Sequence, residues 1–459
     1  MAGPPIVVLS NRGPVSFSPG EGGDLEPRRG AGGLVSGLGP ALVRTDATWI
    51  SAAMTDGDRE VAASGVVDAA GHRVRLLALD PDAYRMAYDV VCNATLWFAY
   101  HELFDRSRRP RFDRRWREAW AAYRETNEAF AAAAVETAPE GAVVLVQDYH
   151  LALVGPQLAA ERPDLRTAHF SHTPFPHPEQ LSVLPDDVVA ELLGGMAGHG
   201  SCGFHSPRWA EAFERSTHAT LGAAPPTFVS PLATDRADLE ATARGDACER
   251  ALERLEGALG GRRLLARVDR IELSKNLLRG FWAFDDLLER HPEWRSEVTF
   301  GAFVYPSRQT LPEYLAYHQE VEEVVRRVNE RWADGDWTPI LLDGDDDYPT
   351  AIAALRRYDA LLVNPIRDGL NLVASEGALV NERDGVVVLS PEAGIWDQLS
   401  GGALPAHPYD VAGTADALHD ALSMPSAERR RRATDLRDAA GRRSPTDWLD
   451  DQVAAALGS

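Results

Sequence analysis

Apolar residues gather along this chain in short, nearly continuous runs, and longer stretches with helical spacing lie between them. The runs at 6–9, 143–146, 361–363 and 386–389 are examples. Strands that are apolar on both faces are typical of parallel sheets covered by helices on both sides. The repeated order of strand and helix therefore predicts an α/β protein with right-handed crossovers.

The clearest helical stretch is 312–332. Pro312 suits the first turn of a helix, and glutamate and arginine residues occupy the positions opposite the apolar ones. The spacing predicts a single apolar face, formed by Leu315, Val321, Val324, Val325 and Val328.

The alternating pattern falls into two blocks, which predict two doubly wound domains. In the first block the late strands are expected at 169–171, 202–204 and 228–230, and in the second block strands begin near Leu264, Val298, Ile340, Leu361, Val386 and Ala403. The stretch 235–259 between the blocks has the pattern of a polar helix, and 444–457 has that of a closing helix. We expect domains at 1–232 and 233–443, followed by a C-terminal helix at 444–459.

Composition and charge restrict the partners. The 459 residues, 44% of them hydrophobic, are enough for two cores of ordinary size. Lys and Arg number 47 and Asp and Glu 69, a net charge of −22, which disfavours nucleic acid and anionic membranes as partners. The same field repels phosphorylated substrates at long range. A substrate of that kind would need arginines and lysines placed directly at its site.

Cysteine usage and hydropathy indicate a cytoplasmic protein. Cys92, Cys202 and Cys248 show no metal-binding or redox spacing and are expected to be packed thiols. No apolar run reaches the roughly 18 residues of a membrane span. The N-terminal residues lack the pattern of a secretory signal.

Ligands of open α/β sheets bind at the carboxyl ends of the strands, so the residues that follow each strand are the candidates for a site. In the first block these are Arg12, the glycine-rich loop at 28–34, Asp148 with His150, and His172. Amides of a glycine-rich loop can hold a phosphate, although this spacing matches no standard phosphate motif and also suits a plain turn. The carboxylate and the histidines could hold sugar hydroxyls, or the histidines could be structural.

Positive charges follow two strands of the second block. Arg270 and Lys275 come after its first strand, at the entrance of a helix, which is the form of a pyrophosphate clamp. Arg308 follows the next strand.

A later run at 364–376 ends a strand, turns at a glycine and begins a helix. The first amides of such a helix, with its dipole, can hold an anion. Asp368 precedes these amides, and Glu376 lies two turns into the helix. Glu376 could accept hydrogen bonds from ribose hydroxyls, or it could be a surface carboxylate of a capped helix.

Taken in order, these segments resemble the trehalose-6-phosphate synthase family over nearly the whole chain. The matching segments are SNRGPV at 10–15, GGLV at 32–35, the stretch 88–97, QDYHLAL at 147–153, SHTPFPHPE at 171–179, GFHSPRWAEAF at 203–213, VDRIELSK at 268–275, YPSR at 305–308, WTPI at 337–340, NPIRDGLNLVASE at 364–376, LSPEAG at 389–394 and HPYDVAGTADAL at 407–418. No single segment is specific, but their order and spacing are.

The resemblance implies a GT-B fold, in which two doubly wound Rossmann-like domains face a deep cleft. It implies transfer of glucose from UDP-glucose or GDP-glucose to glucose 6-phosphate, giving α,α-trehalose 6-phosphate with retention. Neither a metal nor another cofactor is expected, because the nucleotide sugar is a co-substrate. Family members form dimers or tetramers, so a homo-oligomer is one candidate assembly.

The resemblance also implies residue roles. The acceptor would be held by Arg12, Tyr88, Trp97, Asp148 and Arg308. The donor would be held by Gly33, Arg270, Lys275, Asp368, Gly369, Asn371, Leu372, Val373 and Glu376. The residues expected to matter most for the reaction are Asp148, His172, Arg270 and Lys275.

Three departures from the family pattern leave the donor open. Ser375 stands where the family usually has lysine, Asn276 stands where it commonly has glycine, and the acidic run 345–347 is unusual beside a nucleotide pocket. The first alternative is a related enzyme that couples a cyclitol or another sugar nucleotide to a phosphorylated acceptor. The second is a sugar-phosphate sensor without activity.

Overall fold

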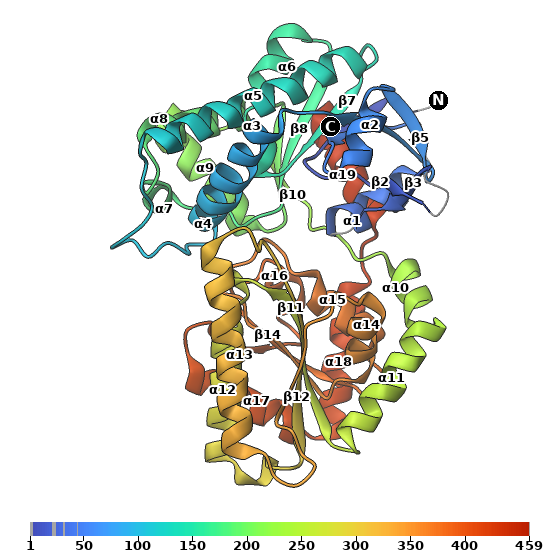
Figure 1. Ribbon diagram of the computed structural model, residues 1–459, viewed down its shortest axis with the longest axis vertical. Helices are drawn as coiled ribbons and strands as arrows, with labels where there is room; N and C mark the ends of the chain where they lie inside the picture. Colours follow the sequence, from blue (N-terminus) through green and yellow to red (C-terminus); the bar gives the residue numbers. More distant parts are fainter. Residues whose placement is uncertain (1–2, 21–23, 31–32, 44, 459) are drawn as a thin grey trace. The chain divides into compact units, whose positions relative to one another are not determined.

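The computed structural model describes residues 3–20, 24–30, 33–43 and 45–458. The chain divides into two units. The first consists of Met1–Leu232 and Pro445–Ser459, and the second of Ala233–Ser444. Each unit has its own sheet with helices packed on its faces (Figure 1). The chain therefore leaves the first unit once and returns to it for the final helix.

The sheet of the first unit has eight strands in the order β10-β9-β8-β7-β1-β4-β6-β5, parallel except for β5. Its strands are β1 (Ile6–Leu9), β4 (Thr48–Ala52), β5 (Val66–Ala69), β6 (His72–Leu77), β7 (Val143–Gln147), β8 (Arg166–Ser171), β9 (Ser201–Phe204) and β10 (Thr227–Val229). A separate antiparallel pair joins β2 (Val15–Pro19) to β3 (Leu25–Arg29). The first strand lies between β4 and β7, so the winding direction changes beside it, and ligands of such sheets bind at that point.

The helices of the first unit connect these strands in chain order. They are α1 (Gly33–Leu42), α2 (Asp56–Ala62), α3 (Pro81–Arg85), the π-helix η1 (Met86–Leu96), α4 (Trp97–Tyr100), α5 (Arg114–Thr137), the short η2 (Tyr149–Leu151), α6 (Gly155–Glu161), α7 (Pro178–Leu181), α8 (Asp186–Ala197), α9 (Pro207–Leu221) and α19 (Pro445–Leu457). Although α19 ends the chain, it packs against β7, β8 and α1 (Figure 1).

The sheet of the second unit has six parallel strands in the order β13-β12-β11-β14-β15-β16. They are β11 (Arg263–Ile271), β12 (Val298–Pro306), β13 (Ile340–Asp343), β14 (Ala360–Val363), β15 (Val386–Leu389) and β16 (Leu404–Pro405). The helices are α10 (Arg236–Ala243), α11 (Asp246–Leu259), η3 (Leu273–Lys275), α12 (Leu277–Arg290), η4 (Pro292–Trp294), α13 (Pro312–Trp332), α14 (Tyr348–Arg357), α15 (Leu372–Val380), α16 (Trp396–Leu399), α17 (Val411–Ser423) and α18 (Ser426–Ala440). Here the winding changes direction between β11 and β14.

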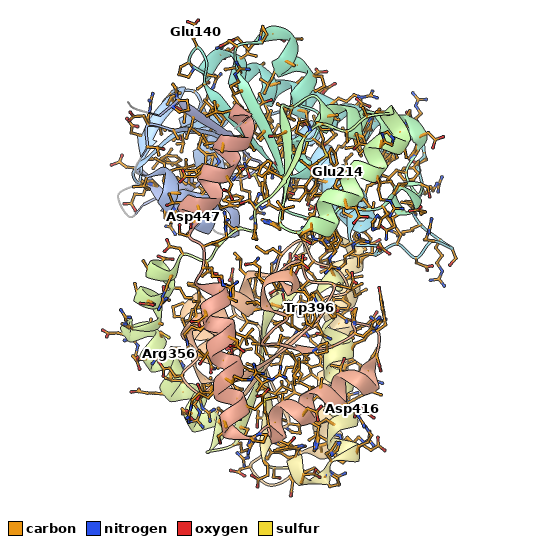
Figure 2. The ribbon with its side chains drawn as sticks, turned by 180° about the vertical axis from the view of Figure 1, so that it is seen from behind. Glu140, Glu214, Arg356, Trp396, Asp416 and Asp447 are labelled. Carbon is orange, nitrogen blue, oxygen red and sulfur yellow. The ribbon has the colours of Figure 1, made fainter. Side chains whose placement is uncertain are left out.

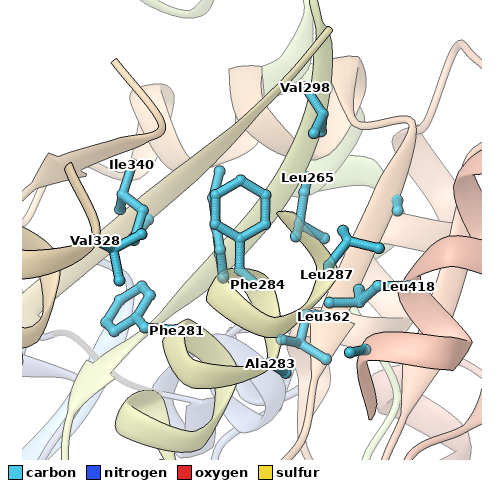
Figure 3. Packing of buried hydrophobic residues seen from close by; sticks show 14 of the residues in the cluster. Leu265, Phe281, Ala283, Phe284, Leu287, Val298, Val328, Ile340, Leu362 and Leu418 are labelled. Carbon is cyan, nitrogen blue, oxygen red and sulfur yellow. The ribbon is translucent and has the colours of Figure 1, made fainter. Parts of the chain in front are cut away.

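The core of the second unit fills the space between this sheet and helices α12, α13 and α17. Phe281 and Phe284 of α12 lie against the strands, with Leu265 and Leu418 near them (Figure 3). All four side chains are fully buried. Removing any one of them would leave a cavity, so the core fixes the position of the strands whose ends carry the site.

Side chains fill both units closely (Figure 2). Arg356 of α14, labelled there, is buried and pairs with Glu249 of α11 at 2.8 Å and with Glu382 at 2.9 Å. The pairing holds α11 against α14 within the second unit. Arginine can be buried here because its charge is met on both sides.

The doubly wound α/β architecture predicted from the apolar runs is confirmed. The predicted helix at 312–332 is α13, with Pro312 in its first turn. The apolar face predicted for it was wrong at one position, because Leu315 is exposed. Tyr314 and Tyr317 are buried instead, since they stand seven and four residues before Val321 and so lie on its side of the helix.

Two further expectations are refined by the structure. The polar helix expected at 235–259 is two helices, because the chain breaks at Gly245 between α10 and α11. The three cysteines are buried and form no disulfide with one another, as expected of packed thiols. Among the described residues no helix is long and apolar enough to cross a bilayer.

Candidate functional site

In the first unit, polar side chains meet at the carboxyl ends of β1 and β7. Arg12 follows β1, and its Nη2 donates to the hydroxyl of Tyr88 at 3.2 Å. The ring of Tyr88 stacks on His150, with 5.8 Å between ring centroids. Nδ1 of His150 lies 3.6 Å from a carboxylate oxygen of Asp148. The exposed guanidinium of Arg12, the phenol of Tyr88 and the carboxylate of Asp148 thus lie at the carboxyl end of the sheet.

Asp148 occupies an unusual backbone position, with φ of 72°. Its carboxylate accepts a hydrogen bond at 3.2 Å from the backbone N–H of His172, which follows β8. Burial alone would raise the pKa of Asp148, but the hydrogen bond from His150 and the nearby His172 outweigh it and lower the pKa to about 2. Asp148 is therefore ionised at neutral pH and acts as a hydrogen-bond acceptor.

Tyr88 and Trp97 are carried by the π-helix η1 and the residue after it. A π-helix, with bonds five residues apart, turns about 82° per residue, so nine residues make about two whole turns. In an α-helix the same nine residues would make about two and a half turns and point the side chains opposite ways. Both rings in fact lie against η2, since Tyr88 stacks on His150 and the ring centroid of Trp97 is 6.2 Å from that of Tyr149.

Gln147, His205 and Trp448, all of the first unit, hold the ring of His172 in place. Its Nε2 lies 2.9 Å from the side-chain oxygen of Gln147, and its Nδ1 lies 3.2 Å from Nε2 of His205. The indole of Trp448, from α19, covers the ring with centroids 5.6 Å apart. Burial lowers the pKa of His172 below its usual value, in spite of the nearby charge of Asp148. The imidazole is thus neutral at neutral pH.

In the second unit, two arginines share one carboxylate at the carboxyl ends of β11 and β12. Oε1 of Glu272 is 2.8 Å from Arg270 and 2.6 Å from Arg308, and it also accepts from the hydroxyl of Ser307 at 2.9 Å. Glu272 is completely buried. Burial would raise its pKa, but the charges of Arg270 and Arg308 lower the pKa to about 2. This fixed negative charge sets the positions of both guanidinium groups.

Lys275 lies between two carboxylates beside that group. Its Nζ is 2.7 Å from Asp368 and 3.4 Å from Asp269. Asp368 also accepts from the side-chain amide of Asn371 at 3.1 Å. Behind them the fully buried Arg267 donates to Asn364 at 2.6 Å and lies 3.5 Å from Asp269. The loop after β14 is therefore joined to the clamp after β11 by charged contacts.

Helix α15 begins directly after the loop that carries Asp368. Asn371, with φ of 83°, precedes the helix, so the amides of Leu372 and Val373 are first-turn amides that the helix itself does not use. The loop before them is held by close packing: a Cβ on Gly394 would lie 1.9 Å from the carbonyl oxygen of Gly369. Only glycine fits there, so the course of the loop is fixed.

Glu376 lies further along α15 and is half-buried. Burial raises its pKa to about 7. No ion pair to its carboxylate is found among the described residues, which explains why the shift is not offset. A carboxylate in this state responds strongly to any hydrogen-bond donor that a ligand brings.

Four residues of these groups have left-handed backbone conformations although none is glycine. They are Asp148, Asn276, Arg308 and Asn371, with φ of 72°, 61°, 45° and 83°. Such conformations cost energy in most residues, and they tend to gather at functional sites. Asn276, where glycine would be expected, is among the residues that tolerate this conformation, and its side-chain amide donates to the carbonyls of Asn364 and Pro408.

One group of potential metal ligands occurs in the described part of the chain, away from the residues above. It consists of His291, Glu293 and His419. The indole N–H of Trp294 donates to Nδ1 of His419 at 3.1 Å, which occupies the lone pair of that nitrogen. The rings of His291 and His419 are stacked with centroids 3.7 Å apart, so their nitrogen lone pairs do not converge on a point. The group is not arranged for a metal ion.

A family model described as glycosyltransferase family 20 matches residues 4–456. The chain belongs to glycosyltransferase family 20. The enzyme class and the two-domain GT-B fold expected from the sequence are thereby confirmed.

Two relatives of this family 20 chain are similar over almost all of its length. The trehalose-6-phosphate synthase of Mycobacterium sp. (strain JLS) is 32% identical, over 94% of this chain and 92% of the relative. The bifunctional trehalose-6-phosphate synthase/phosphatase of Thermoproteus tenax is 30% identical over 98% of this chain. The chain spans only 63% of the length of that second relative.

Solved structures are also similar to this chain over nearly its whole length. The Escherichia coli protein bound with UDP-2-fluoro glucose superimposes with a TM-score of 0.86 at 26% identity, covering 98% of each chain. An α,α-trehalose-phosphate synthase (UDP-forming) from Burkholderia xenovorans, in complex with glucose-6-phosphate, gives 0.85 at 27% identity, covering 99% of this chain and 100% of the other.

The residues predicted from the sequence of this family 20 enzyme form two groups, one in each unit. Arg12, Tyr88, Trp97, Asp148 and His172 lie together in the first unit. Arg270, Lys275, Arg308, Asp368 and Asn371 lie together in the second, where Gly369, Leu372, Val373 and Glu376 follow on the same loop and helix. Gly33 is the first residue of α1, but residues 31 and 32 of its glycine-rich loop lie outside the described residues.

Sequence reasoning did not single out several residues that hold these groups in place. Glu272 and Asp269 lie inside the segment 268–275, and a carboxylate at the end of a buried strand was an available signal. Arg267 was a second signal, since an arginine within an apolar strand needs a partner. Gln452 gave no signal, because its partner Gln147 lies 305 residues earlier.

Proposed function

We propose that this glycosyltransferase moves glucose from a nucleoside diphosphate glucose to glucose 6-phosphate, forming α,α-trehalose 6-phosphate with retention. The observation that carries the proposal is the charge at the carboxyl end of the second sheet. Four cations, Arg267, Arg270, Lys275 and Arg308, lie with three carboxylates, Asp269, Glu272 and Asp368, which leaves a net charge of 4 − 3 = +1. In a chain with a formal charge of −22, this is a local site for an anion.

The donor diphosphate would bind at this cationic group. Arg270 and Lys275 would contact the phosphate oxygens, together with the first-turn amides of Leu372 and Val373. Lys275 is already oriented by Asp368, which would then face the donor glucose. Glu376 would accept hydrogen bonds from the ribose hydroxyls, and the amides near Gly369 and Asn371 would complete the donor site.

The acceptor would bind with its phosphate on Arg12 and Tyr88. Arg12 and Tyr88 already contact each other, so a phosphate could bridge them without rearrangement. Asp148 is ionised and would accept from sugar hydroxyls, and Trp97 would lie against the sugar ring. A phosphorylated hexose therefore matches the residue types of the first unit.

For the reaction itself, we propose substitution on one face of the donor sugar. The bond between the anomeric carbon and the diphosphate oxygen breaks, and the leaving diphosphate takes the proton of the attacking acceptor hydroxyl. The protein contributes positioning and stabilisation of the charge that develops on the leaving phosphate. Arg270 and Lys275 are the groups placed for that stabilisation.

The test is a nucleotide-release assay on the purified protein, with glucose 6-phosphate and, in separate reactions, UDP-, GDP- or ADP-glucose. Release that depends on the acceptor, with trehalose 6-phosphate as the product, is the expected result and identifies the base. Silence with all three donors, from protein shown by circular dichroism to be folded, would contradict the proposal. Release that requires a cyclitol donor or acceptor instead would favour the related coupling enzyme.

We further propose that the reaction needs no metal ion, because Arg270 and Lys275 supply the positive charge that a metal would otherwise bring to the diphosphate. Activity that survives prolonged treatment with EDTA is the expected result. Loss of activity with EDTA, restored by adding a divalent cation, would refute it.

A further inference from the structure

A line of hydrogen bonds runs through His172 and ends at a backbone group on each side. The N–H of Leu232 donates to Nδ1 of His205 at 3.3 Å. Nε2 of His205 is 3.2 Å from Nδ1 of His172, whose Nε2 is 2.9 Å from the side-chain oxygen of Gln147. The amide of Gln147 donates to Gln452 of α19 at 2.9 Å.

The direction of every bond in this line follows from its ends. A backbone N–H can only donate, so Nδ1 of His205 must accept, and the proton of His205 must sit on Nε2. The Nε2–H of His205 therefore donates to Nδ1 of His172. The proton of His172 must then lie on Nε2, where it donates to the side-chain oxygen of Gln147. At the far end the amide of Gln452 lies 3.5 Å from the carbonyl of Trp448, which can only accept. The two ends agree, and they leave one arrangement of protons.

We infer that Gln452 of the C-terminal helix is a positioning residue, which fixes His172 as the neutral tautomer protonated on Nε2. Gln452 and Gln147 are both completely buried, so neither has water as a substitute partner. Gln452 holds the amide of Gln147 so that its oxygen faces His172. Without Gln452, the amide of Gln147 could rotate and present its N–H₂ to Nε2 of His172, which opposes the proton positions set from the Leu232 end and leaves the two tautomers mixed.

The groups around His172 act on its charge in opposite directions, because burial favours a neutral ring and the carboxylate of Asp148 favours a charged one. Asp148 faces it from the end of β7, His150 lies beyond Asp148, and His205 faces it from the end of β9. On the α19 side Trp448 covers the ring and carries no charge. Burial lowers the pKa of His172, which agrees with the tautomer that the hydrogen bonds require.

This arrangement determines what His172 can do in the reaction. Both of its ring nitrogens are occupied by protein groups, so the imidazole does not take up a proton from the acceptor. It supports the segment whose backbone N–H binds Asp148. This catalytic consequence rests on the proposed function, whereas the tautomer does not.

The first experiment measures the tautomer directly. Protein labelled with ¹⁵N in its histidine rings is studied by NMR at neutral pH, and His172 is assigned from the signal lost in His172→Gln. The expected result is a protonated Nε2 and an unprotonated Nδ1. A proton on Nδ1, or a charged ring, would overturn the inference without any variant of Gln452 and without any assay of activity.

The second experiment uses Gln452→Leu, which removes both hydrogen-bonding groups of that side chain, and Gln452→Glu, which keeps an acceptor for Gln147. In the leucine variant we expect the Nε2–H signal of His172 to be lost or mixed with the other tautomer, and kcat to fall at least tenfold while the KM for glucose 6-phosphate changes less than threefold. The glutamate variant should keep the tautomer and most of kcat.

Asp451→Ala is the matched control. Asp451 lies on the same helix and accepts from the hydroxyl of Ser230 at 2.7 Å, outside the line of bonds. Its replacement should weaken the attachment of α19 and leave the tautomer of His172 unchanged. A leucine variant that keeps both the tautomer and kcat would overturn the inference. A wild-type protein with the expected tautomer but no glucosyl transfer would refute the proposed function and leave the tautomer assignment standing.

Discussion

At the scale of single residues, the site is built from charged groups that each contact at least one group of opposite charge. Glu272 serves Arg270 and Arg308 together, and Lys275 lies between Asp269 and Asp368. Buried charges are tolerated only when they are paired in this way. The pairs hold the cations in place before a substrate arrives, which reduces the ordering cost of binding.

Replacing Arg270 by alanine should reduce kcat/KM more than it reduces stability. Loss of one strong charged contact to the leaving phosphate costs about 2–4 kcal/mol of transition-state stabilisation, a fall of roughly 30- to 1000-fold. Steady-state kinetics by nucleotide release would measure it. Arg326→Ala is the control, because Arg326 pairs with exposed glutamates of α13 and its replacement should leave the rate unchanged. Full activity in Arg270→Ala would refute the assignment.

Donor binding should strengthen as the pH rises through 7. Burial raises the pKa of Glu376 to about 7, so the unliganded protein keeps this proton at pH 6 and has lost it at pH 8. Because the proposed contact with the ribose hydroxyls needs the ionised form, the donor should bind roughly tenfold more tightly at pH 8 than at pH 6. The same shift makes the unliganded fold lose stability as the pH rises from the usual carboxylate pKa through 7. Calorimetric titrations with the nucleotide sugar would measure the affinity.

Glu376→Gln is the matched variant for that prediction, since it keeps the shape and removes the titration. Its affinity should be lower and nearly independent of pH across the same range. An identical pH dependence in the wild type and the variant would show that another group is responsible.

At the scale of elements, the π-helix η1 decides which residues of the first unit can act together. Nine residues separate Tyr88 from Trp97, and only a helix with wider turns brings both rings onto η2. The apolar pattern of 86–96 suits an ordinary α-helix equally well. Sequence therefore predicted the residues but not the geometry that unites them.

Deleting Ala94 should separate Tyr88 from Trp97. Ala94 is the residue of the second half of η1 that is only half-buried, so its loss shortens the helix with little cavity formation. The deletion turns Trp97 by about 80° relative to Tyr88. We expect the KM for glucose 6-phosphate to rise at least tenfold, with far-UV circular dichroism unchanged. Ala94→Gly keeps the length and should stay within threefold of the wild type, and an unchanged KM in the deletion would disprove the argument.

At the scale of the whole molecule, the last residues of the chain complete the first unit. Trp448 of α19 is fully buried against Phe170, with ring centroids 5.0 Å apart, and Gln452 joins Gln147. The first unit can therefore reach its final packing only after the second unit has been synthesised. This order makes the stability of the first unit sensitive to the C-terminus.

Trp448→Ala should destabilise the first unit and spare the second. Loss of a buried tryptophan costs about 3–5 kcal/mol, because the cavity that remains cannot collapse fully. When hydrogen exchange is measured in increasing urea, the amides of β7 and β8 should lose protection while those of β11 and β12 keep it. Leu457→Ala is the control, since 46% of Leu457 is exposed. Equal loss of protection in both units would contradict this view.

Local patterns in the sequence were enough to predict the α/β architecture, the long helix α13 and most of the candidate residues. It could do so because apolar runs, turn residues and charges after strands are local signals. The folded chain was needed to show that Leu315 faces solvent, that Glu272 joins Arg270 to Arg308, and that Gln452 holds Gln147. These contacts depend on which strands become neighbours and on where α19 returns. The pairing of distant segments is set by the packing of the whole unit and leaves no trace in the local pattern.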